Sequence, residues 1–519
     1  MENKYILAID QSTAGTKALV VDRHGRVVAR SNRDHEQIYP RPGWVEHDPN
    51  EIYDNLKRTA REAIELAGIA PSELVALSIT NQRETAVLWD RATGEPVYNA
   101  IVWQCQRTAD RIARLKSAGQ EQTVRAKTGL KLDPYFSAAK WSWMLEQVDP
   151  MAEKRSRGRL LAGTIDSWLI WKLTGGRTHA TDYTNASRTS LFNIYTLGWD
   201  EELCRLFGVP MELLPEVGFS DDIYGYTDDP DLFGERIPIC GVIGDSQAAL
   251  FGQLCLTPGA AKATYGTGTS VLMNTGERAV ASDNGLVTTI AWGSGGKVTY
   301  ALEAIVRSSG DTVKWVRDNL GLFGTFQELD DMLARTPDNE GIYLVPAFVG
   351  MGAPYWDPYA RAAIIGMSRS SGKAHIVRAA AESIAYQVRD AADLMAAASG
   401  IRLVKLHADG GASTNALLMQ FQADMLELPL LTSGIAELSA IGSVYLSGLG
   451  VGLWGSLDDI LQMKRQEKHY LPSMEPAVRD RLYDGWKKAV ASVIHGEPSD
   501  KRQEESTRCI RNNPESGSC

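Results

Sequence analysis

Cysteine and positive charge are both scarce in this sequence. Six cysteines occur among 519 residues, and their spacing fits neither a metal site nor a disulfide framework. Lys and Arg number 54 against 64 Asp and Glu, a formal net charge of −10, and no long basic run occurs. We therefore expect a reducing, cytoplasmic location and no nucleic-acid partner.

An export signal and a membrane span are also not expected. The first ten residues, MENKYILAID, place Asp10 where a signal peptide would need its apolar core. The longest uncharged run, 438–457, contains five glycines and four serines, which makes it a poor membrane segment. It predicts instead a tightly packed helix followed by a Gly-rich turn, and no membrane insertion.

The length and the hydrophobic periodicity favour two large α/β domains. The composition, 44% hydrophobic and 23% charged residues, is ordinary for a globular protein. Predicted strands are 5–9, 18–21, 75–80, 97–103, 343–348 and 403–408. Predicted helices are 51–67, 138–147, 163–173, 248–254, 313–320, 375–398 and 416–426. Residues 220–236 carry turn signals and predict an irregular connector.

A turn rich in hydroxyl groups joins the first two predicted strands. The stretch DQSTAGTK (10–17) presents an acid, two threonines, a glycine and a lysine. A carboxylate such as that of Asp10 suits Mg²⁺, and backbone N–H groups with an ammonium suit phosphate. If this pattern occurred only once, a surface hairpin that carries polar side chains would be the alternative to a Mg²⁺ and phosphate site.

The pattern occurs again in the second half of the chain. Residues 265–270, YGTGTS, form a glycine and hydroxyl turn between two strand-like runs. A third turn, DGGASTN (409–415), follows a predicted strand and precedes a helix, where close backbone approach to a nucleotide is favoured. The repetition predicts two similar lobes that enclose one nucleotide. A simple hairpin remains the alternative for the second turn.

Asp245 follows an apolar run and precedes a predicted helix. An acid at the end of a strand can act as a general base, and the Thr267 turn nearby can hold phosphate. Together they predict phosphoryl transfer to a hydroxyl group. The alternative is that Asp245 only caps the helix.

Polar and aromatic residues at other strand ends are candidates for binding the acceptor. Arg83 and Glu84 follow the strand 75–80 and offer a donor and an acceptor to a polyhydroxy compound. Trp103 is a candidate apolar wall, and Tyr135 lies in a turn after Pro134. The alternatives are a surface ion pair, a core tryptophan and a surface tyrosine.

At this point the chain resembles the FGGY family of carbohydrate kinases over residues 4–490. Two family signatures are present, YFSAAKWSW (135–143) and a segment from Ala362 through Gly366 and His375 to Glu382. Five stretches resemble the glycerol kinase group within the family: QIYPRPGWVEHDP (37–49), TNQRET (80–85), YNAIVWQC (98–105), TDYTNASRT (181–189) and PAFVGMGAPYWDPYAR (346–361).

The resemblance implies an α/β fold of two ribonuclease-H/actin-like lobes with nucleotide and substrate between them. We expect an N-terminal lobe at 1–255, a C-terminal lobe at 256–495 and a polar, disordered tail at 496–519. ATP and Mg²⁺ are the implied cofactors, a small polyol is the implied substrate, and the family allows a homodimer or homotetramer.

The resemblance also assigns roles to residues of this sequence. Asp245 matches the general base, and Asp10 the acid near Mg²⁺. Residues that match ATP contacts are Thr13, Ala14, Gly15, Lys17, Thr267, Gly310, Lys314, Gly411 and Asn415. Residues that match the substrate pocket are Arg83, Glu84, Trp103, Tyr135, Asp245 and Ser246.

Several positions depart from the usual pattern of glycerol kinases. Ser246 replaces a glutamine, Ser270 an aromatic residue and Arg307 a phenylalanine, while Ser12 and Lys17 replace a glycine and an arginine. Two serines should make the pocket wider and more polar, and each lost contact with a three-carbon substrate is worth about 1–3 kcal/mol. This favours a larger acceptor, such as a tetritol, another polyol or a small ketose. A rearranged glycerol site, or a water molecule in the gap, is the alternative.

The combined interpretation is an ATP- and Mg²⁺-dependent kinase for a small polyol, with glycerol as the first expected substrate. A non-enzymatic, actin-like nucleotide-binding scaffold would predict loss of Asp245 or Asp10, and both are present. A dinucleotide oxidoreductase would need a G-x-G-x-x-G turn that opens a helix, whereas the first turn leads into a strand.

Overall fold

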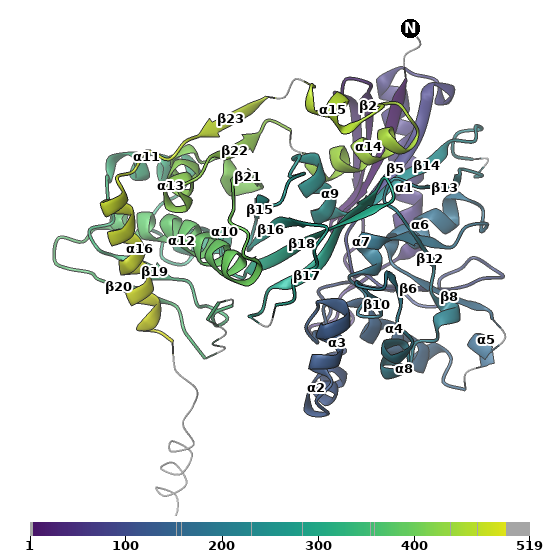
Figure 1. Ribbon diagram of the computed structural model, residues 1–519, viewed down its shortest axis with the longest axis horizontal. Coiled ribbons are helices and arrows are strands. Elements are labelled where there is room, and N and C mark those ends of the chain that lie inside the picture. The colour runs from purple at the N-terminus through teal and green to yellow at the C-terminus, as the bar shows by residue number, and fades with distance from the viewer. Residues whose placement is uncertain are drawn as a thin grey trace, which may run out of the picture.

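The computed structural model describes residues 4–494, except 152, 157, 230, 283, 353, 356, 358, 436, 464 and 465. The predicted tail 496–519 lies outside the described residues. The chain folds into two lobes, each built around one large mixed sheet, and they lie side by side (Figure 1). The predicted α/β class is therefore confirmed.

The sheet of lobe one has the strand order β13-β14-β5-β1-β2-β3. Its strands are β1 (Tyr5–Gln11), β2 (Gly15–Asp22), β3 (Val27–Asp34), β5 (Leu74–Asn81), β13 (Ile223–Tyr226) and β14 (Pro238–Gly244). The first three form an antiparallel meander, and β1, β5 and β14 run parallel.

The sheet of lobe two has the order β17-β18-β16-β15-β21-β22-β23. Its strands are β15 (Ala260–Tyr265), β16 (Thr269–Gly276), β17 (Val287–Ser294), β18 (Lys297–Val306), β21 (Lys405–Asp409), β22 (Leu430–Ser433) and β23 (Glu467–Tyr470). Strands β15, β21 and β22 run parallel to one another. Strand β16 is antiparallel to both of its neighbours, β15 and β18. Apart from β17, each strand matches a strand of lobe one in position and direction, so the predicted similarity of the lobes is confirmed.

Small two-stranded pairs complete the strand inventory. They are β4 (Glu46–His47) with β7 (Ala100–Ile101), β6 (Val87–Asp90) with β8 (Leu160–Gly163), β9 (Ala180–Asp182) with β12 (Glu216–Gly218), β10 (Phe192–Asn193) with β11 (Gly198–Trp199), and β19 (Tyr343–Val345) with β20 (Ala363–Ile365).

Helices cover both sheets. Those of lobe one are α1 (Pro49–Ala67), α2 (Ala109–Ser117), α3 (Glu121–Thr128), α4 (Ser137–Val148), α5 (Glu153–Ser156), α6 (Ile165–Leu173), α7 (Tyr183–Ala186), α8 (Glu201–Phe207) and α9 (Asp245–Gly252). Those that follow are α10 (Gly310–Asp318), α11 (Phe326–Arg335), α12 (Lys373–Ser399), α13 (Ala416–Leu426), α14 (Leu438–Gly450), α15 (Leu457–Leu461) and α16 (Pro476–Ala491).

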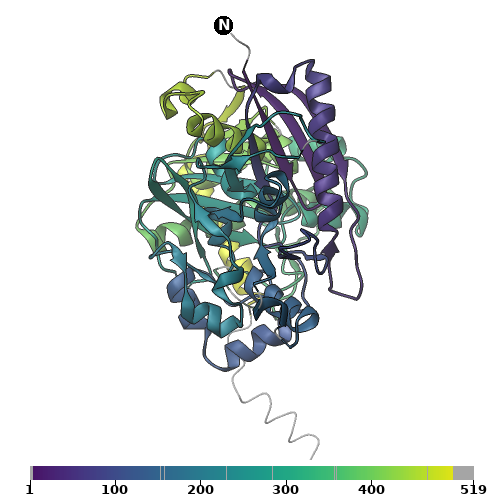
Figure 2. The ribbon, with the colours of Figure 1, turned by 90° about the vertical axis from the view of Figure 1, so that its right-hand side faces the viewer.

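Helix α1 shows how local sequence sets these boundaries. The side chain of Asp48 accepts a hydrogen bond from the N–H of Asn50, Pro49 occupies the first turn, and Gly68 ends the helix with a φ of 66°. The buried face of α1 packs on β2 and β3, and the helix runs along one side of lobe one (Figure 2).

Helix α14 comes late in the chain but packs on the sheet of lobe one. It contacts β14, β5, β1 and α9, and its Ser443 hydroxyl lies 3.0 Å from that of Ser78 on β5. Gly442 permits the close approach of α14 to α9, because a Cβ there would lie 1.8 Å from the carbonyl oxygen of Ala248 on α9. The predicted packed helix in 438–457 is confirmed.

Two predictions of secondary structure need correction. Residues 220–236 are not wholly irregular, because β13 pairs with β14 as an edge strand. The predicted strand 97–103 is reduced to the two residues of β7. Within the described part of the chain, no helix is both long and apolar enough to cross a membrane.

Candidate active site

Three parallel strands of lobe one end in register at one edge of the sheet. Gln11 at the end of β1 and Gly244 at the end of β14 both pair with Asn81 at the end of β5. The segments that follow these ends are 12–14, 82–84 and Asp245. Because ligands bind beyond the carboxyl ends of such strands, the topology brings the predicted site residues together.

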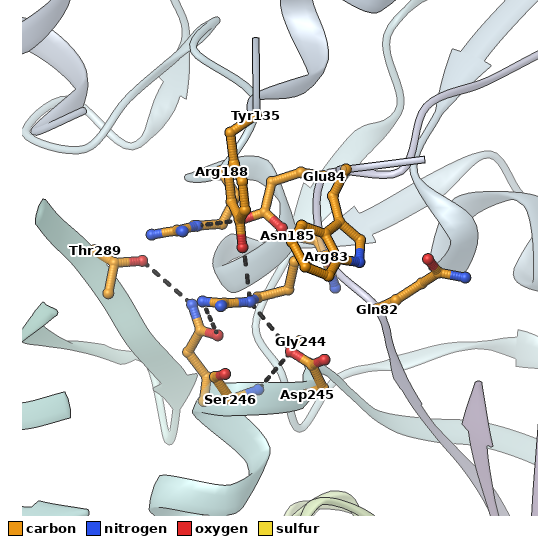
Figure 3. A network of polar contacts seen from close by, with 12 residues as sticks. Gln82, Arg83, Glu84, Tyr135, Asn185, Arg188, Gly244, Asp245, Ser246 and Thr289 are labelled. Atoms are coloured by element: carbon orange, nitrogen blue, oxygen red, sulfur yellow. Dashed lines mark hydrogen bonds and ion pairs between the residues drawn. The ribbon is translucent and has the colours of Figure 1, made fainter. Parts of the chain in front are cut away.

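Asp245 is the first residue of α9 and directs its carboxylate toward Arg83 (Figure 3). Its Oδ1 accepts a hydrogen bond from the N–H of Ser246 at 2.6 Å and lies 3.1 Å from Nε of Arg83. The side chain is 39% exposed, so an acceptor can reach it. The N-cap position belongs to Gly244, which has no side-chain cap, so the capping alternative for Asp245 is wrong.

Arg83 is buried and connects both lobes, because it bonds to Gln247 of lobe one and Glu303 of lobe two. Its Nη1 donates to Gln247 Oε1 and its Nη2 to Glu303 Oε1, both at 3.2 Å. Burial works against the charge, but the carboxylates of Glu303 and Glu84 outweigh it and raise the pKa of Arg83. The guanidinium is therefore fixed and charged, and the alternative of a surface ion pair is wrong.

Two residues that sequence analysis did not select complete this charge cluster. Arg188 Nε donates to Glu84 Oε1 at 2.5 Å, and its Nη1 lies 2.7 Å from Glu303 Oε2. Burial alone would raise the pKa of Glu303, but Arg188 and Arg83 lower it to about 2. Glu303, on β18 of lobe two, is thus ionised and joins the lobes beneath the acceptor residues.

Glu84 adopts a strained backbone conformation at this site. Its φ is 61°, which is unusual for a residue with a side chain, and Ser137 Oγ donates to its carbonyl oxygen at 3.1 Å. The adjacent aromatic wall consists of Trp103 and Tyr135, whose rings pack edge to face with their centroids 5.4 Å apart. Both are half-buried, so neither the core-tryptophan nor the surface-tyrosine alternative describes them.

The first loop, residues 12–14, connects β1 and β2 with its backbone carbonyl groups engaged. The carbonyl oxygens of Thr13 and Ala14 accept from Gln37 Nε2 at 2.9 Å and from the N–H of His35 at 3.2 Å. Among the described residues, the N–H groups of Thr13 and Ala14 have no protein acceptor. Gly15 follows at a position where a Cβ would lie 2.4 Å from the Arg33 carbonyl oxygen. The loop can therefore present N–H groups to an anion.

Asp10 lies beside this loop, opposite Lys17 in the β1–β2 pairing. Its carboxyl is 8% exposed, and burial raises its pKa to about 6, with Lys17 opposing and Asp245 adding to the shift. A buried carboxylate near a second one fits a cation. No group of three metal-ligating side chains occurs among the described residues, so Mg²⁺ here would need water and phosphate oxygens as further ligands.

The second loop, residues 266–268, connects β15 and β16 in lobe two. Its Thr267 carbonyl oxygen accepts from the N–H groups of Ser309 and Asp311, and its Gly266 carbonyl oxygen from that of Gly310. In the described chain, the N–H groups of Thr267 and Gly268 have no protein acceptor. Gly310 thus anchors the loop at the start of α10, and Lys314 is exposed one turn further on.

The third predicted turn packs against the second loop's strand. A Cβ on Gly410 would lie 2.5 Å from the Tyr265 carbonyl oxygen, whereas Gly411 faces open space. Asn415 caps α13, accepting from the N–H of Leu418 at 2.7 Å, and its amide donates to Asp330. Its side chain is therefore already engaged within the protein.

The unusual residues of the sequence lie around the acceptor residues. Ser246 follows Asp245 and donates its backbone N–H to it, and Ser270 Oγ donates to Glu303 Oε1 at 3.4 Å, so the Ser270 hydroxyl group borders the charge cluster. Ser270 pairs with Ile305, which is 45% exposed. Arg307 lies two residues beyond Ile305, exposed, with its Nη1 at 3.4 Å from the Val349 carbonyl oxygen.

Four residues that position the site were not selected from sequence: Arg188, Glu303, Gln247 and Thr184. Thr184 Oγ1 accepts from the N–H of Gly244 at 2.9 Å and so fixes the backbone before Asp245. Arg188 and Thr184 lie within the family-like stretch 181–189, which was the available signal. Glu303 and Gln247 lie inside regular elements, where a buried charge or amide has no local signature.

Known proteins match nearly the whole chain. Models of the N-terminal and C-terminal domains of the FGGY family of carbohydrate kinases match residues 5–252 and 261–450. A glycerol kinase of Xanthomonas campestris is 51% identical over 494 residues, 95% of this chain and 99% of the relative. Glycerol kinase 2 of Thermotoga maritima is 51% identical over 491 residues with the same coverage. A crystal structure of Plasmodium falciparum glycerol kinase with ADP is 37% identical, with a TM-score of 0.90, over 95% of this chain and 99% of that one.

Proposed function

This chain belongs to the FGGY family of carbohydrate kinases, and we propose that it phosphorylates glycerol with ATP, giving sn-glycerol 3-phosphate and ADP. The observation that carries the proposal is the accessible carboxylate of Asp245, 3.1 Å from the buried Arg83 at the common end of three strands. The likeness to glycerol kinases over 95% of the chain supports the choice of glycerol.

Asp245 accepts the proton of a terminal hydroxyl group as its oxygen attacks the γ-phosphorus. The bond to the bridging oxygen of ADP breaks, and the proton stays on Asp245 until it passes to solvent. Arg83 donates to a second hydroxyl group and Glu84 accepts from one, while Trp103 and Tyr135 contact the carbon chain. Because Arg83 is fixed by Glu303 and Gln247, the acceptor is oriented without rearrangement of the site.

The first and second loops hold the phosphates through backbone N–H groups, and Lys17 adds a positive charge. Residues assigned to ATP are Thr13, Ala14, Gly15, Lys17, Thr267, Gly310, Lys314, Gly411 and Asn415. Mg²⁺, which when bound neutralises charge on the phosphates, would be held at Asp10. A homodimer or homotetramer stays a prediction.

A longer polyol or a ketose is the second candidate acceptor. Two features favour it: the small side chain of Ser246 next to Asp245, and the hydroxyl group of Ser270 beside the exposed side chain of Ile305. Small polar side chains leave room for additional carbons and hydrogen bonds for their hydroxyl groups.

An ADP-release assay with Mg-ATP against a panel of acceptors tests both proposals. The panel holds glycerol, dihydroxyacetone, erythritol, threitol, xylitol, ribitol and ketopentoses. A highest kcat/KM with glycerol supports the first proposal, and a highest value with a longer acceptor supports the second. Release that no acceptor stimulates would contradict both and favour the nucleotide-binding scaffold.

The double variant Ser246→Gln with Ser270→Phe sharpens the choice between acceptors. If the serines widen the site, this variant gains kcat/KM for glycerol and loses it for four- and five-carbon acceptors. The matched control is Ser294→Gln, which alters a half-buried serine bonded to Asp221 away from the acceptor residues. Equal losses for all acceptors in the double variant would contradict the widening.

A further inference from the structure

A closed ring of hydrogen bonds connects the acceptor wall with the first loop. On one side, Trp103 Nε1 donates to Thr13 Oγ1 at 2.9 Å. On the other side, a chain of five bonds leads from the backbone of Trp103 to the backbone of Thr13. The distances in that chain are Trp103 N–Thr85 Oγ1 3.3 Å, Thr85 Oγ1–Gln82 Oε1 2.9 Å, Gln82 Nε2–His47 Nδ1 3.3 Å, His47 Nε2–Gln37 Oε1 2.9 Å and Gln37 Nε2–Thr13 O 2.9 Å.

We propose that Trp103 is a positioning residue that couples occupation of the acceptor site to the conformation of the first loop. The proposal rests on the kinase function stated above. The indole ring of Trp103 lies in the proposed acceptor site, and its N–H donates to Thr13 in the proposed ATP site. One side chain therefore belongs to both sites. An acceptor packed on the ring fixes the indole, and the fixed indole holds Thr13.

On the five-bond side of the ring, the buried imidazole of His47 sets which groups donate and which accept. Burial, with a further contribution from His35, lowers the pKa of His47 to about 3, so its imidazole is neutral. A neutral imidazole facing Gln37 Oε1 carries its proton on Nε2 and accepts from Gln82 at Nδ1. Gln37 Oε1 then accepts from His47, and Gln37 Nε2 faces Thr13 O as a donor.

The indole is the part of the ring that an acceptor reaches. Gln37, His47 and Gln82 lie behind the loop, and His47 and Gln82 are buried, at 0% and 1% exposure. Trp103 is half-buried and its ring meets Tyr135, on the acceptor side. The bond from Nε1 to Thr13 is therefore the member of the ring that acceptor binding can strengthen.

Coupling of this kind is reciprocal. If an acceptor strengthens nucleotide binding by some factor, nucleotide must strengthen acceptor binding by the same factor. One hydrogen bond between uncharged groups supports a factor of about two- to tenfold. This factor can be measured without turnover, by titrating Mg-ADP with and without a saturating acceptor.

Trp103→Phe tests the proposal, because phenylalanine keeps an aromatic wall and removes the N–H donor. We expect the coupling factor, which is the ratio of Mg-ADP affinities with and without saturating acceptor, to fall to near one whatever the change in the Kd of the acceptor alone. Trp141→Phe is the matched control, since its indole donates to the Val87 carbonyl oxygen in the core and touches neither loop. An unchanged coupling factor in Trp103→Phe would overturn the proposal.

Thr13→Val, alone and combined with Trp103→Phe, identifies the partner. We expect the double variant to lose no more coupling than either single variant, as holds for two ends of one bond. Additive losses would overturn the direct contact. The acceptor used is the one that gives the highest kcat/KM, so failure of glycerol as substrate and failure of the coupling are separate results.

Discussion

The first and second loops are both proposed to bind phosphate, but different hydrogen bonds hold them in place. Both connect antiparallel strands, and in both the carbonyl groups are engaged while two N–H groups point to no protein acceptor among the described residues. The first loop, 12–14, is held by the backbone N–H of His35 and also by the side chains of Gln37, Gln82 and Trp103. The second loop, 266–268, is held by the backbone at the start of α10. Equivalent strands thus carry equivalent loops, but within the described part of the chain only the first loop is connected by side chains to the acceptor residues.

The lobes also differ in the charges that they bring to the site. At the acceptor residues, lobe one supplies Arg83, Glu84, Arg188 and Asp245, whereas lobe two supplies Glu303 with the buried Lys262 near it. On the proposed mechanism, proton transfer and acceptor recognition therefore belong to lobe one, and lobe two completes the charge balance. Four predictions test these comparisons, in order of decreasing effect.

Asp245→Asn should have the largest effect, because no residue of lobe two can replace a base on lobe one. We expect kcat to fall about 10³-fold, within the range for loss of a general base. Binding of Mg-ADP and the thermal unfolding temperature, measured in parallel, should stay near those of the unmodified protein. Retention of a tenth of the original turnover would contradict the assignment.

Glu303→Gln removes the charge that lobe two contributes and leaves Arg83 and Arg188 buried without full compensation. We expect the free energy of unfolding in urea to fall by about 3–5 kcal/mol. The control, Glu277→Gln, affects an exposed ion pair with Lys297 and should change stability by less than about 1 kcal/mol. Equal effects of the two variants would show that Glu303 does not join the lobes.

Alanine substitutions in the two loops compare them directly. A Cβ would lie 2.4 Å from a carbonyl oxygen at Gly15 and also at Gly268, but 3.5 Å from the nearest atom at Gly266. We expect Gly15→Ala and Gly268→Ala to lower stability by about 1–3 kcal/mol and raise the KM for ATP. Gly266→Ala is the control and should leave the KM for ATP within about threefold. If Gly268→Ala changed neither stability nor the KM for ATP, the second loop would tolerate displacement.

The smallest predicted effect is a dependence of kcat/KM on pH that arises from Asp10 of lobe one. Burial raises the pKa of Asp10 to about 6, with Lys17 opposing, so its carboxyl is protonated and unable to hold Mg²⁺ below that pH. At low Mg²⁺, kcat/KM should decline as pH falls through 6, and higher Mg²⁺ should move the decline to lower pH. Asp10→Asn should abolish this shift. A decline that ignores Mg²⁺ would contradict the metal assignment.

Much of the fold could be predicted because its signals are local. The predicted helix 416–426 coincides with α13, and 51–67 differs from α1 by two residues at its start. The edge strand β13 was missed because it is short and lies among turn residues. Asp245 and Arg83 were found because strand ends can be located from sequence.

Other site residues depend on contacts between distant parts of the chain. Glu303 is separated from Arg83 by 220 residues and from Arg188 by 115, and inside a strand it resembles any exposed glutamate. The ring through His47, Gln37 and Thr13 is equally non-local. Sequence therefore indicated the groups proposed to react but not the residues that hold them in place.

The position of α14 has a consequence for how the protein is made. The sheet residues Ile6, Leu19, Ala76 and Ile243 share one apolar cluster with α14, whose residues begin at Leu438. A ribosome therefore finishes the strands of lobe one long before it supplies the helix that covers them. During that interval the nascent chain exposes an apolar sheet face, which needs a chaperone or a partner to keep it from aggregating. Residues 1–255 made alone should consequently be insoluble, and adding 438–450 in trans should rescue them.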